Sequence, residues 1–177
     1  SCDLCVRGAN PELATERDVL ADVRRAARLL ATTDGVATVI PNVGTNVGMA
    51  LPDASGPTDV AAIPGRIHTM RGRVEIPSEP AFGASSNVST VILAARSVDP
   101  ESNGALNLAT DDALLDAARD RGIDPLQFDA DYENRGQRLR ERFDERGSVP
   151  RIVYHEWAFG IEPITYVLGA TAEAAAG

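Results

Sequence analysis

Apolar residues near the start of the chain recur with the period of a helix. Between residues 15 and 30 one face is apolar, and the opposite face carries arginine and acidic residues. The apolar face consists of Val19, Val23, Ala26, Ala27 and Leu30. Thr15 with Asp18 fits a helix N-terminus, and Gly35 fits a helix end. The pattern therefore predicts an amphipathic helix over residues 15–30.

The next stretch is rich in β-branched residues and is interrupted by glycine. Residues 36–52 predict short strands around a loop at residues 42–46. Residues 58–62 predict a single helical turn. The runs 66–70 and 73–76 are separated by only two residues, and they predict a hairpin with a tight turn.

Helices and short strands are intermixed in the second half. After a loop rich in Pro and Gly at residues 77–84, Ser85 and Ser86 open a helix, and Thr110 caps another that ends at Gly122. Strands are predicted over residues 105–108, 126–128, 151–154 and 161–168, and a tail helix over residues 170–175. One domain of the α/β or α+β class follows from this mixture.

Residues 133–146 are strongly charged, with Leu139 and Phe143 as their only large apolar residues. This pattern is typical of a solvated helix with pairs of opposite charge four residues apart. A basic docking surface is the alternative interpretation.

The length and composition are those of a soluble domain. Apolar residues make up 44% of the chain and charged residues 24%. The sequence contains no apolar run of membrane-spanning length and no signal-peptide pattern. We therefore expect an intracellular, cytoplasmic protein without a membrane partner.

The charge balance is acidic, since acidic residues outnumber basic ones by 26 to 17 and there is no lysine. Such a composition is typical of proteins from salt-loving archaea, although a GC-rich genome that encodes Arg in place of Lys would give the same pattern. A net charge of −9 argues against nucleic-acid binding by this domain alone, because neutralisation of the phosphates needs a basic surface.

Both cysteines lie at the start of the chain, as Cys2 and Cys5 in a C-x-x-C pair. The pair is half of a possible zinc site, but no second pair follows, and His68 and His155 are distant in sequence. A redox pair or inert thiols are the alternatives. Because the chain begins with Ser, residues 1–14 are interpreted as the junction to an upstream segment, and residues 15–177 as the domain itself.

One constellation in the sequence suits an anion. The common motifs for nucleotide binding, zinc proteases and serine hydrolases are absent. Residues 83–87 lead directly into a helix, whose free N–H groups and dipole favour a negative ligand. Arg66 follows a Pro-Gly pair at the mouth of the hairpin, where a guanidinium could bind a phosphate oxygen. The plainer interpretation is an ordinary N-cap and a surface arginine.

A series of short motifs is spread in a fixed order over nearly the whole length of the chain. Residues 40–52 are similar to I-P-x-V-G-x-N…A-L-P, residues 60–67 to V-A-x-I-P-G-R-I, and residues 82–86 match F-G-A-S-S. Shorter matches follow at residues 99–101 (D-P-E), 128–129 (F-D), 149–154 and 160–163. Individually these motifs are weak, but together and in this order the chain resembles the thiamine-phosphate synthase (ThiN) domain family specifically.

The resemblance implies a three-layer α/β/α fold with a mixed sheet, similar to class II aldolases (AraD-like). Enzymes of the family join a pyrimidine diphosphate to a thiazole phosphate and release pyrophosphate, commonly with Mg²⁺. No cofactor is otherwise expected. Arg66 matches the family's essential arginine, and the implied ligand contacts are Gly44, Asn46, Arg66, Gly83, Ala84, Ser85, Ser86, Asn87, Asn107, Asp129 and Glu162.

The family's essential histidine follows F-G-A-S-S, and here that position is Asn87. Asparagine cannot titrate near neutral pH, so general acid–base catalysis at this position is lost. Ile161 replaces the lysine before Glu162, and the segment after Asp129 is short for the extra helix of the enzymes.

Archaeal repressors combine a helix-turn-helix domain with a ThiN-like domain that lacks these features. We therefore interpret the chain as a sensor of thiamine phosphate or thiamine diphosphate in a repressor of thiamine genes. It would be a homodimer that contacts DNA only through the upstream domain. A working thiamine-phosphate synthase is one alternative, and a module for a different phosphate ligand or a pure assembly domain is the other.

Overall fold

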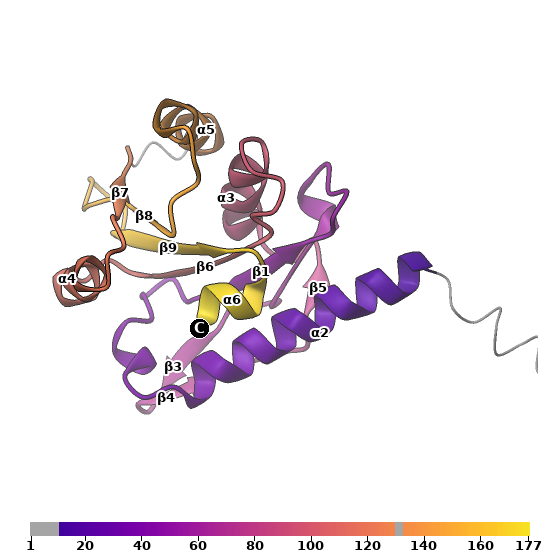
Figure 1. Cartoon of the computed structure of the whole chain (residues 1–177). Coiled ribbons are helices and arrows are strands. Elements are labelled where there is room, and N and C mark those ends of the chain that lie inside the picture. The colour runs from indigo at the N-terminus through magenta and orange to yellow at the C-terminus, as the bar shows by residue number, and fades with distance from the viewer. Residues whose placement is uncertain (1–10, 130–132) are drawn as a thin grey trace, which may run out of the picture.

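A seven-stranded mixed sheet lies at the centre of the structure, a computed structural model that describes residues 11–129 and 133–177 (Figure 1). Its strand order is β5-β2-β1-β6-β9-β8-β7, and β7 and β8 form its parallel pair. The strands are β1 (Val47–Ala50), β2 (Val60–Ala62), β5 (Ala81–Phe82), β6 (Gly104–Ala109), β7 (Leu126–Gln127), β8 (Ile152–Tyr154) and β9 (Ile164–Gly169). A separate hairpin is formed by β3 (His68–Met70) and β4 (Arg73–Glu75).

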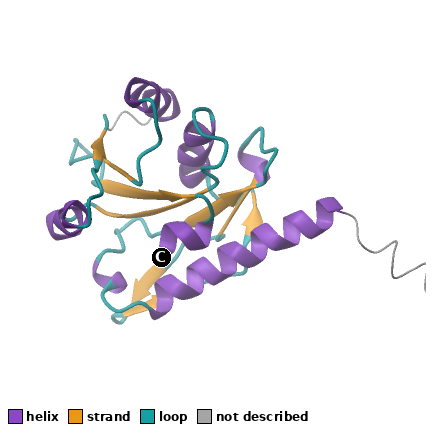
Figure 2. Cartoon of the chain, viewed as in Figure 1, coloured by secondary structure: helices purple, strands orange, loops and turns teal. Residues whose placement is uncertain are grey.

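Helices cover both faces of the sheet (Figure 2). One face packs against α3 (Ser86–Arg96) and α5 (Arg135–Arg146) through an apolar cluster that includes Val88, Phe143 and Tyr166. The other face packs against α2 (Pro11–Thr32), α4 (Asp112–Asp120) and α6 (Ala172–Ala176). The expected three-layer α/β/α fold with a mixed sheet is therefore confirmed.

The first predicted helix is confirmed and is longer than its pattern indicated. The α2 helix begins at Pro11, so Thr15 and Asp18 lie inside it and do not mark its start. All five residues of its predicted apolar face are buried against the sheet, at Val19, Val23, Ala26, Ala27 and Leu30.

Three other local predictions were wrong or incomplete. Residues 58–62 do not form one helical turn, because a 3-10 turn over Pro57–Asp59 leads into β2, whose three residues are buried between β1 and β5. Of residues 36–52, Val36–Thr38 form a 3-10 helix and β1 is the strand. The cap of α4 is Asp111 rather than Thr110, since its carboxylate accepts the N–H groups of residues 113 and 114.

Two glycines allow layers of the fold to approach closely. A Cβ on Gly48 of β1 would lie 2.8 Å from Val88 Cγ1, so the first turn of α3 rests directly on the sheet. A Cβ on Gly104 would lie 2.1 Å from backbone atoms of Thr171, where β9 turns into α6. The first of these contacts fixes the N-terminus of α3 above the middle of the sheet.

Nowhere in residues 11–129 and 133–177 is there a helix with the length and apolar character needed to cross a membrane.

Candidate functional site

The N-termini of α3 and α5 meet over the same face of the sheet. Asn87 is the second residue of α3, and Arg135 is the first residue of α5. The Arg135 guanidinium donates to Asn87 Oδ1 at 2.9 Å and to the Tyr166 hydroxyl at 3.0 Å. The central guanidinium carbon of Arg135, Cζ, lies 5.8 Å from the centroid of the Tyr166 ring. Arg135 is only 5% exposed, so a cation is held inside the protein beside the position expected for the family's histidine.

The close approach of these helices depends on a small residue after Arg135. A Cβ on Gly136 would lie 3.2 Å from Thr90 Cγ2 of α3. The prediction of a solvated helix over residues 133–146 therefore needs correction at its N-terminus, where Arg135 is buried. The sequence pattern does not distinguish Arg135 from the other charged residues of this helix.

An aromatic group adjoins Arg135. The rings of Phe128 and His155 lie edge to face, with their centroids 5.4 Å apart. The ring centroids of Phe128 and Tyr166 are 6.3 Å apart. His155 is 1% exposed, and this burial lowers its pKa below the ordinary value. The charge of Arg135 also lowers the pKa to a smaller extent, whereas a contact with the Glu156 carbonyl raises it. His155 is therefore a neutral imidazole near pH 7. Sequence reasoning did not place it in the site.

Arg66 lies in a loop with unusual backbone conformation. Its φ is +63°, directly after Gly65 at +81°. The guanidinium donates to the Val43 carbonyl at 2.8 Å. Glu162 binds the same turn, because its carboxylate accepts the N–H groups of Asn42 at 2.8 Å and Val43 at 3.2 Å. Arg66 and Glu162 are therefore brought together by a shared turn.

Asn46 and Asn107 form a buried hydrogen-bonded pair beneath this loop. Asn107 Oδ1 accepts from the Asn46 N–H at 2.7 Å, and its amide donates to the Gly44 carbonyl at 3.0 Å. The Asn46 side chain binds both the N–H and the carbonyl of Ile63. These contacts position the backbone around Gly44, whose close neighbours include Cβ of Arg66.

The predicted residues before α3 have different surroundings. Ser85 is the N-cap, and its hydroxyl accepts the Val88 N–H at 3.2 Å. Ser86 is exposed at the first helical position. The Gly83 N–H donates to the Val60 carbonyl, so Gly83 and Ala84 lie beside the start of β2, whereas Arg66 follows its end. Asp129 is exposed and directly follows Phe128.

The register of the sheet connects the two halves of the site. Asn107 of β6 is paired directly with Tyr166 of β9, so both side chains project from the same face. Arg66 is therefore linked to Tyr166 through neighbouring residues: Arg66 lies beside Gly44, Gly44 accepts a hydrogen bond from Asn107, and Asn107 is the strand partner of Tyr166. Hydrogen bonds continue this linkage from Tyr166 through Arg135 to Asn87.

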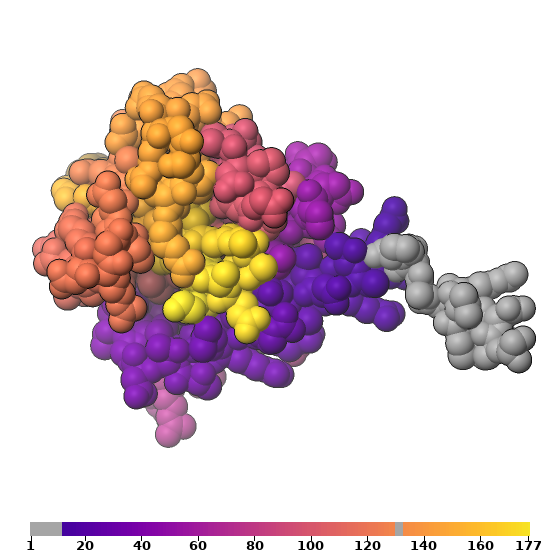
Figure 3. Space-filling view, in the orientation of Figure 1, coloured from indigo at the N-terminus to yellow at the C-terminus, as the bar shows by residue number. Residues whose placement is uncertain are grey.

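No metal cluster is found in the described part of the chain, where no three His, Cys, Asp or Glu residues gather as ligands. Cys2 and Cys5 lie outside the described residues. An apolar hollow of about 490 Å³ lies on the opposite face of the sheet, between α4 and the C-terminal ends of α2 and α6. Figure 3 shows α6 lying directly against α2 on the surface, with α4 farther to the left.

Comparisons of the sequence with a protein family and with individual proteins all match thiamine biosynthesis proteins. A family described as "Thiamine-phosphate synthase ThiN" matches residues 22–177. The chain is 30% identical over 161 residues to "Thiamine-phosphate synthase ThiN" of Methanothermobacter thermautotrophicus, which covers 85% of each protein. It is 31% identical over 170 residues to "Bifunctional thiamine biosynthesis protein ThiDN" of Methanocaldococcus jannaschii, which covers 93% of this chain and 40% of that protein.

Solved structures agree on the fold. The C-terminal domain of a phosphomethylpyrimidine kinase superposes with a TM-score of 0.82 at 22% identity, over 91% of this chain and 96% of that one. An aldolase II superfamily protein from Pseudomonas syringae gives a TM-score of 0.52 at 14% identity, over 91% and 70%. The expected similarity to class II aldolases is confirmed at the level of the fold.

Proposed function

Because the chain belongs to the thiamine-phosphate synthase ThiN family, we propose that it binds a pyrimidine diphosphate and a thiazole phosphate and joins them to form thiamine phosphate. The observation that carries the proposal is the buried Arg135 beside Asn87, in a region connected by contacts to Arg66. Two guanidinium groups and the N-terminus of α3 suit ligands that carry several phosphate charges.

The reaction requires charge stabilisation more than proton transfer. The bond between the pyrimidine methylene carbon and the diphosphate oxygen breaks, and the diphosphate leaves with the electron pair. The thiazole nitrogen then forms the new bond with its lone pair and becomes cationic. No proton moves in this step, so cations near the leaving oxygen contribute most to the rate. Arg135 and Arg66 can meet that demand although Asn87 cannot titrate.

Mg²⁺ fits this arrangement as a companion of the diphosphate. Such an ion is commonly bound by one or two carboxylates and by the phosphate oxygens themselves. Asp129, exposed beside Phe128, and Glu162 are the candidate carboxylates in this region. When bound, the ion would neutralise part of the diphosphate charge.

A second candidate function is favoured by Asn87 itself. Its side chain is held by Arg135 as a fixed hydrogen-bond acceptor, which suits binding without turnover. The domain would then sense thiamine phosphate or thiamine diphosphate, and it would control thiamine genes through an upstream helix-turn-helix domain. A homodimer would match a palindromic operator. We place this repressor function second because the relative from Methanothermobacter thermautotrophicus is named a thiamine-phosphate synthase.

The synthase proposal is tested by incubating the protein with both phosphorylated precursors and Mg²⁺, with thiamine phosphate measured by chromatography. We expect turnover, and we expect Arg66→Ala to reduce it about 100-fold, as for loss of a charged group at a developing negative charge. Arg71→Ala is the matched control, since Arg71 lies exposed in the turn of the β3–β4 hairpin and should leave the rate unchanged.

Calorimetry separates the two functions. Tight binding of thiamine phosphate without any turnover would support the sensor and exclude the synthase. Absence of binding by the precursors, thiamine phosphate and thiamine diphosphate would exclude both. Asn87→Ala should weaken binding about fivefold in either case, because it removes a neutral hydrogen-bonding group. An unchanged affinity would place Asn87 outside the site.

A further inference from the structure

The loop between β8 and β9 carries the two most exposed large apolar side chains of the described residues. Trp157 is 70% exposed and Phe159 is 94% exposed. Aromatic residues make up only 5% of the sequence, and Trp157 is its single tryptophan. In a chain with so few aromatic residues, two exposed rings on one short loop indicate a binding surface.

Both ends of this loop are fixed in the candidate site. At its start, His155 packs against Phe128 beside Arg135, and its N–H donates to the Ile164 carbonyl at 3.0 Å. At its end, Glu162 binds the backbone of the turn that Arg66 also contacts. The loop therefore runs from the Arg135 half of the site to the Arg66 half, and its two rings lie between these anchored ends.

The two rings differ in their position on the loop. The Ile161 N–H donates to the Ala158 carbonyl at 2.9 Å, and Gly160 has a φ of +72°, so residues 158–161 form a tight turn. Phe159 lies at the tip of that turn. Trp157 lies at its base, two residues after the buried His155, and is the closer ring to the site in the sequence.

The charge around Trp157 suits a cationic ring. Its neighbour Glu156 is exposed, and Glu162 lies at the far end of the same loop. Tryptophan has the best aromatic face for a cation, and acidic groups nearby strengthen that preference. Joining the pyrimidine to the thiazole nitrogen makes the thiazole ring a cation, whereas the free thiazole phosphate has a neutral ring.

We propose that Trp157 stacks on the heteroaromatic ring of the ligand and that it favours the cationic thiazolium of thiamine phosphate. This inference rests on the proposed binding of phosphorylated thiamine compounds. The phosphate is held by the arginines, and Trp157 supplies the ring recognition that a phosphate site lacks. Trp157 is thus a specificity residue of the site.

The test uses the fluorescence of the intact protein, because Trp157 is the only tryptophan. Titration with thiamine phosphate should quench and shift this emission with the Kd that calorimetry gives. Trp157→Ala should weaken binding of thiamine phosphate about tenfold and of thiazole phosphate about threefold. It should leave the affinity for inorganic pyrophosphate, which has no ring, unchanged.

Phe159→Ala is the matched control, since it removes a more exposed ring from the same loop and should change each affinity less than about twofold. Trp157→Phe should retain part of the affinity lost in Trp157→Ala, which a merely structural role at an exposed position would not explain.

The possible failures are distinguishable. If calorimetry shows binding but the tryptophan emission and the Trp157→Ala affinity are unchanged, the inference is wrong and the proposed function stands. If the wild-type protein binds none of these ligands, both are wrong. If Trp157→Ala leaves the affinities unchanged and light scattering shows that a dimer becomes a monomer, the ring contacts a second copy of the chain instead.

Discussion

Arg66 adopts a backbone conformation that its residue type disfavours. Only two non-glycine residues in the described part of the chain have positive φ, Arg66 at +63° and Arg71 at +51°. Arg71 lies with Gly72 in the two-residue turn of a hairpin, where positive φ at both positions matches the twist of the strands. Arg66 is in no such hairpin turn, and its conformation costs about 1 kcal/mol. Strain of this kind is concentrated at functional sites, which agrees with the proposed role of its guanidinium.

Comparison of two substitutions at Arg66 measures this strain. Both Arg66→Ala and Arg66→Gly remove the guanidinium and its bond to Val43, but only glycine adopts positive φ without cost. We expect Arg66→Gly to be more stable than Arg66→Ala by about 1 kcal/mol in urea denaturation, while both weaken ligand binding to the same extent. Equal stabilities would show that the backbone at Arg66 is not strained.

His155 should make stability depend on pH. Burial lowers its pKa in the folded protein below the ordinary 6.5. The unfolded chain therefore binds a proton at a higher pH than the folded protein does. The stabilisation is fully present above about pH 6.5 and is lost as the pH falls toward the lower, folded-state pKa.

Denaturation at pH values between about 7.5 and 5.5 checks this expectation. As the pH is lowered, the free energy of unfolding of the wild type should decrease. It should decrease less in His155→Gln, because glutamine cannot titrate. Identical slopes in the two proteins would contradict the proposed state of His155.

The site residues differ in how far the sequence could reveal them. Arg66, Asn87 and Glu162 were predicted because each lies within a family motif. Arg135 was not, because its role depends on contacts with Asn87, 48 residues away, and Tyr166, 31 residues away. Nothing in a charged helical pattern indicates which arginine will be buried by another helix.

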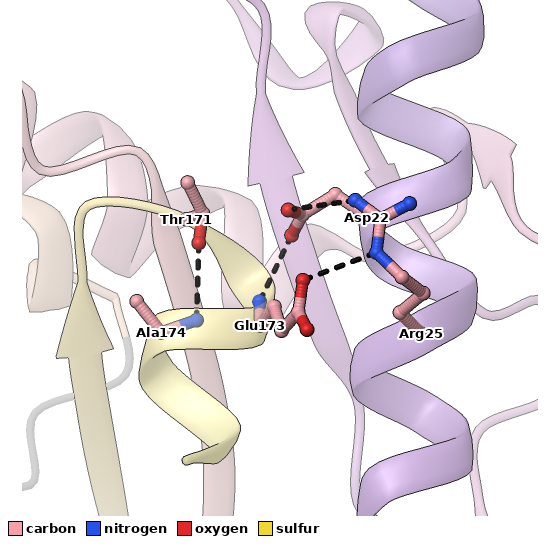
Figure 4. A network of polar contacts seen from close by, with 5 residues as sticks. All are labelled: Asp22, Arg25, Thr171, Glu173 and Ala174. Carbon is pink, nitrogen blue, oxygen red and sulfur yellow. Dashed lines mark hydrogen bonds and ion pairs between the residues drawn. The ribbon is translucent and has the colours of Figure 1, made fainter.

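At the level of elements, the short C-terminal helix α6 depends on its neighbour α2. Five residues are too few for a helix to be stable in isolation. Two acceptors satisfy its first N–H groups: Thr171 caps the N–H of Ala174, and Asp22 of α2 accepts the N–H of Glu173 at 2.9 Å (Figure 4). Arg25 contacts both Asp22 and Glu173 and thereby joins the two helices.

Asp22→Ala should therefore destabilise the protein. It leaves the Glu173 N–H without its acceptor in a partly buried position, which costs about 1–2 kcal/mol. Asp22→Asn keeps an acceptor oxygen and should cost less than half as much. Asp18→Ala, one turn earlier on the exposed surface of α2, is the control and should change the free energy of unfolding by less than about 0.5 kcal/mol. Equal effects of Asp22→Ala and Asp18→Ala in urea denaturation would refute this account of α6.

Helices were predicted better than strands for a physical reason. The apolar face of α2 repeats over several turns, so its pattern is clear even though its first residue was misplaced. Strand β2 has three residues, Val60, Ala61 and Ala62, all buried. A run this short has no measurable period, and its alanines favour a helix as much as a strand. Its conformation is decided by pairing with β1 and β5.

For the whole molecule, two electrostatic effects oppose each other. Four ion pairs in the described part of the chain join exposed side chains: Arg24–Glu79, Arg25–Glu173, Arg119–Asp116 and Arg142–Glu145. Pairs of this kind contribute about 0–1 kcal/mol each and weaken in salt. The net charge of −9 acts in the other direction, because mutual repulsion of the excess carboxylates destabilises the compact state and is screened by salt.

Added salt should raise the stability of this protein, because the repulsion of nine excess charges outweighs a few exposed pairs. The screening length falls from about 10 Å at 0.1 M to about 3 Å at 1 M, so most of the gain should appear within that range. We expect the melting temperature to rise by about 5 °C in KCl. A variant carrying Asp18→Asn, Asp120→Asn and Asp144→Asn lacks three negative charges at exposed positions, two of them in the last turns of α4 and α5. The melting temperature of this variant should rise less with KCl than that of the wild type. A melting temperature that falls with KCl would mean that the ion pairs outweigh the repulsion, whereas a rise that continues well beyond 1 M would favour the hydrated carboxylate surface of a salt-adapted protein.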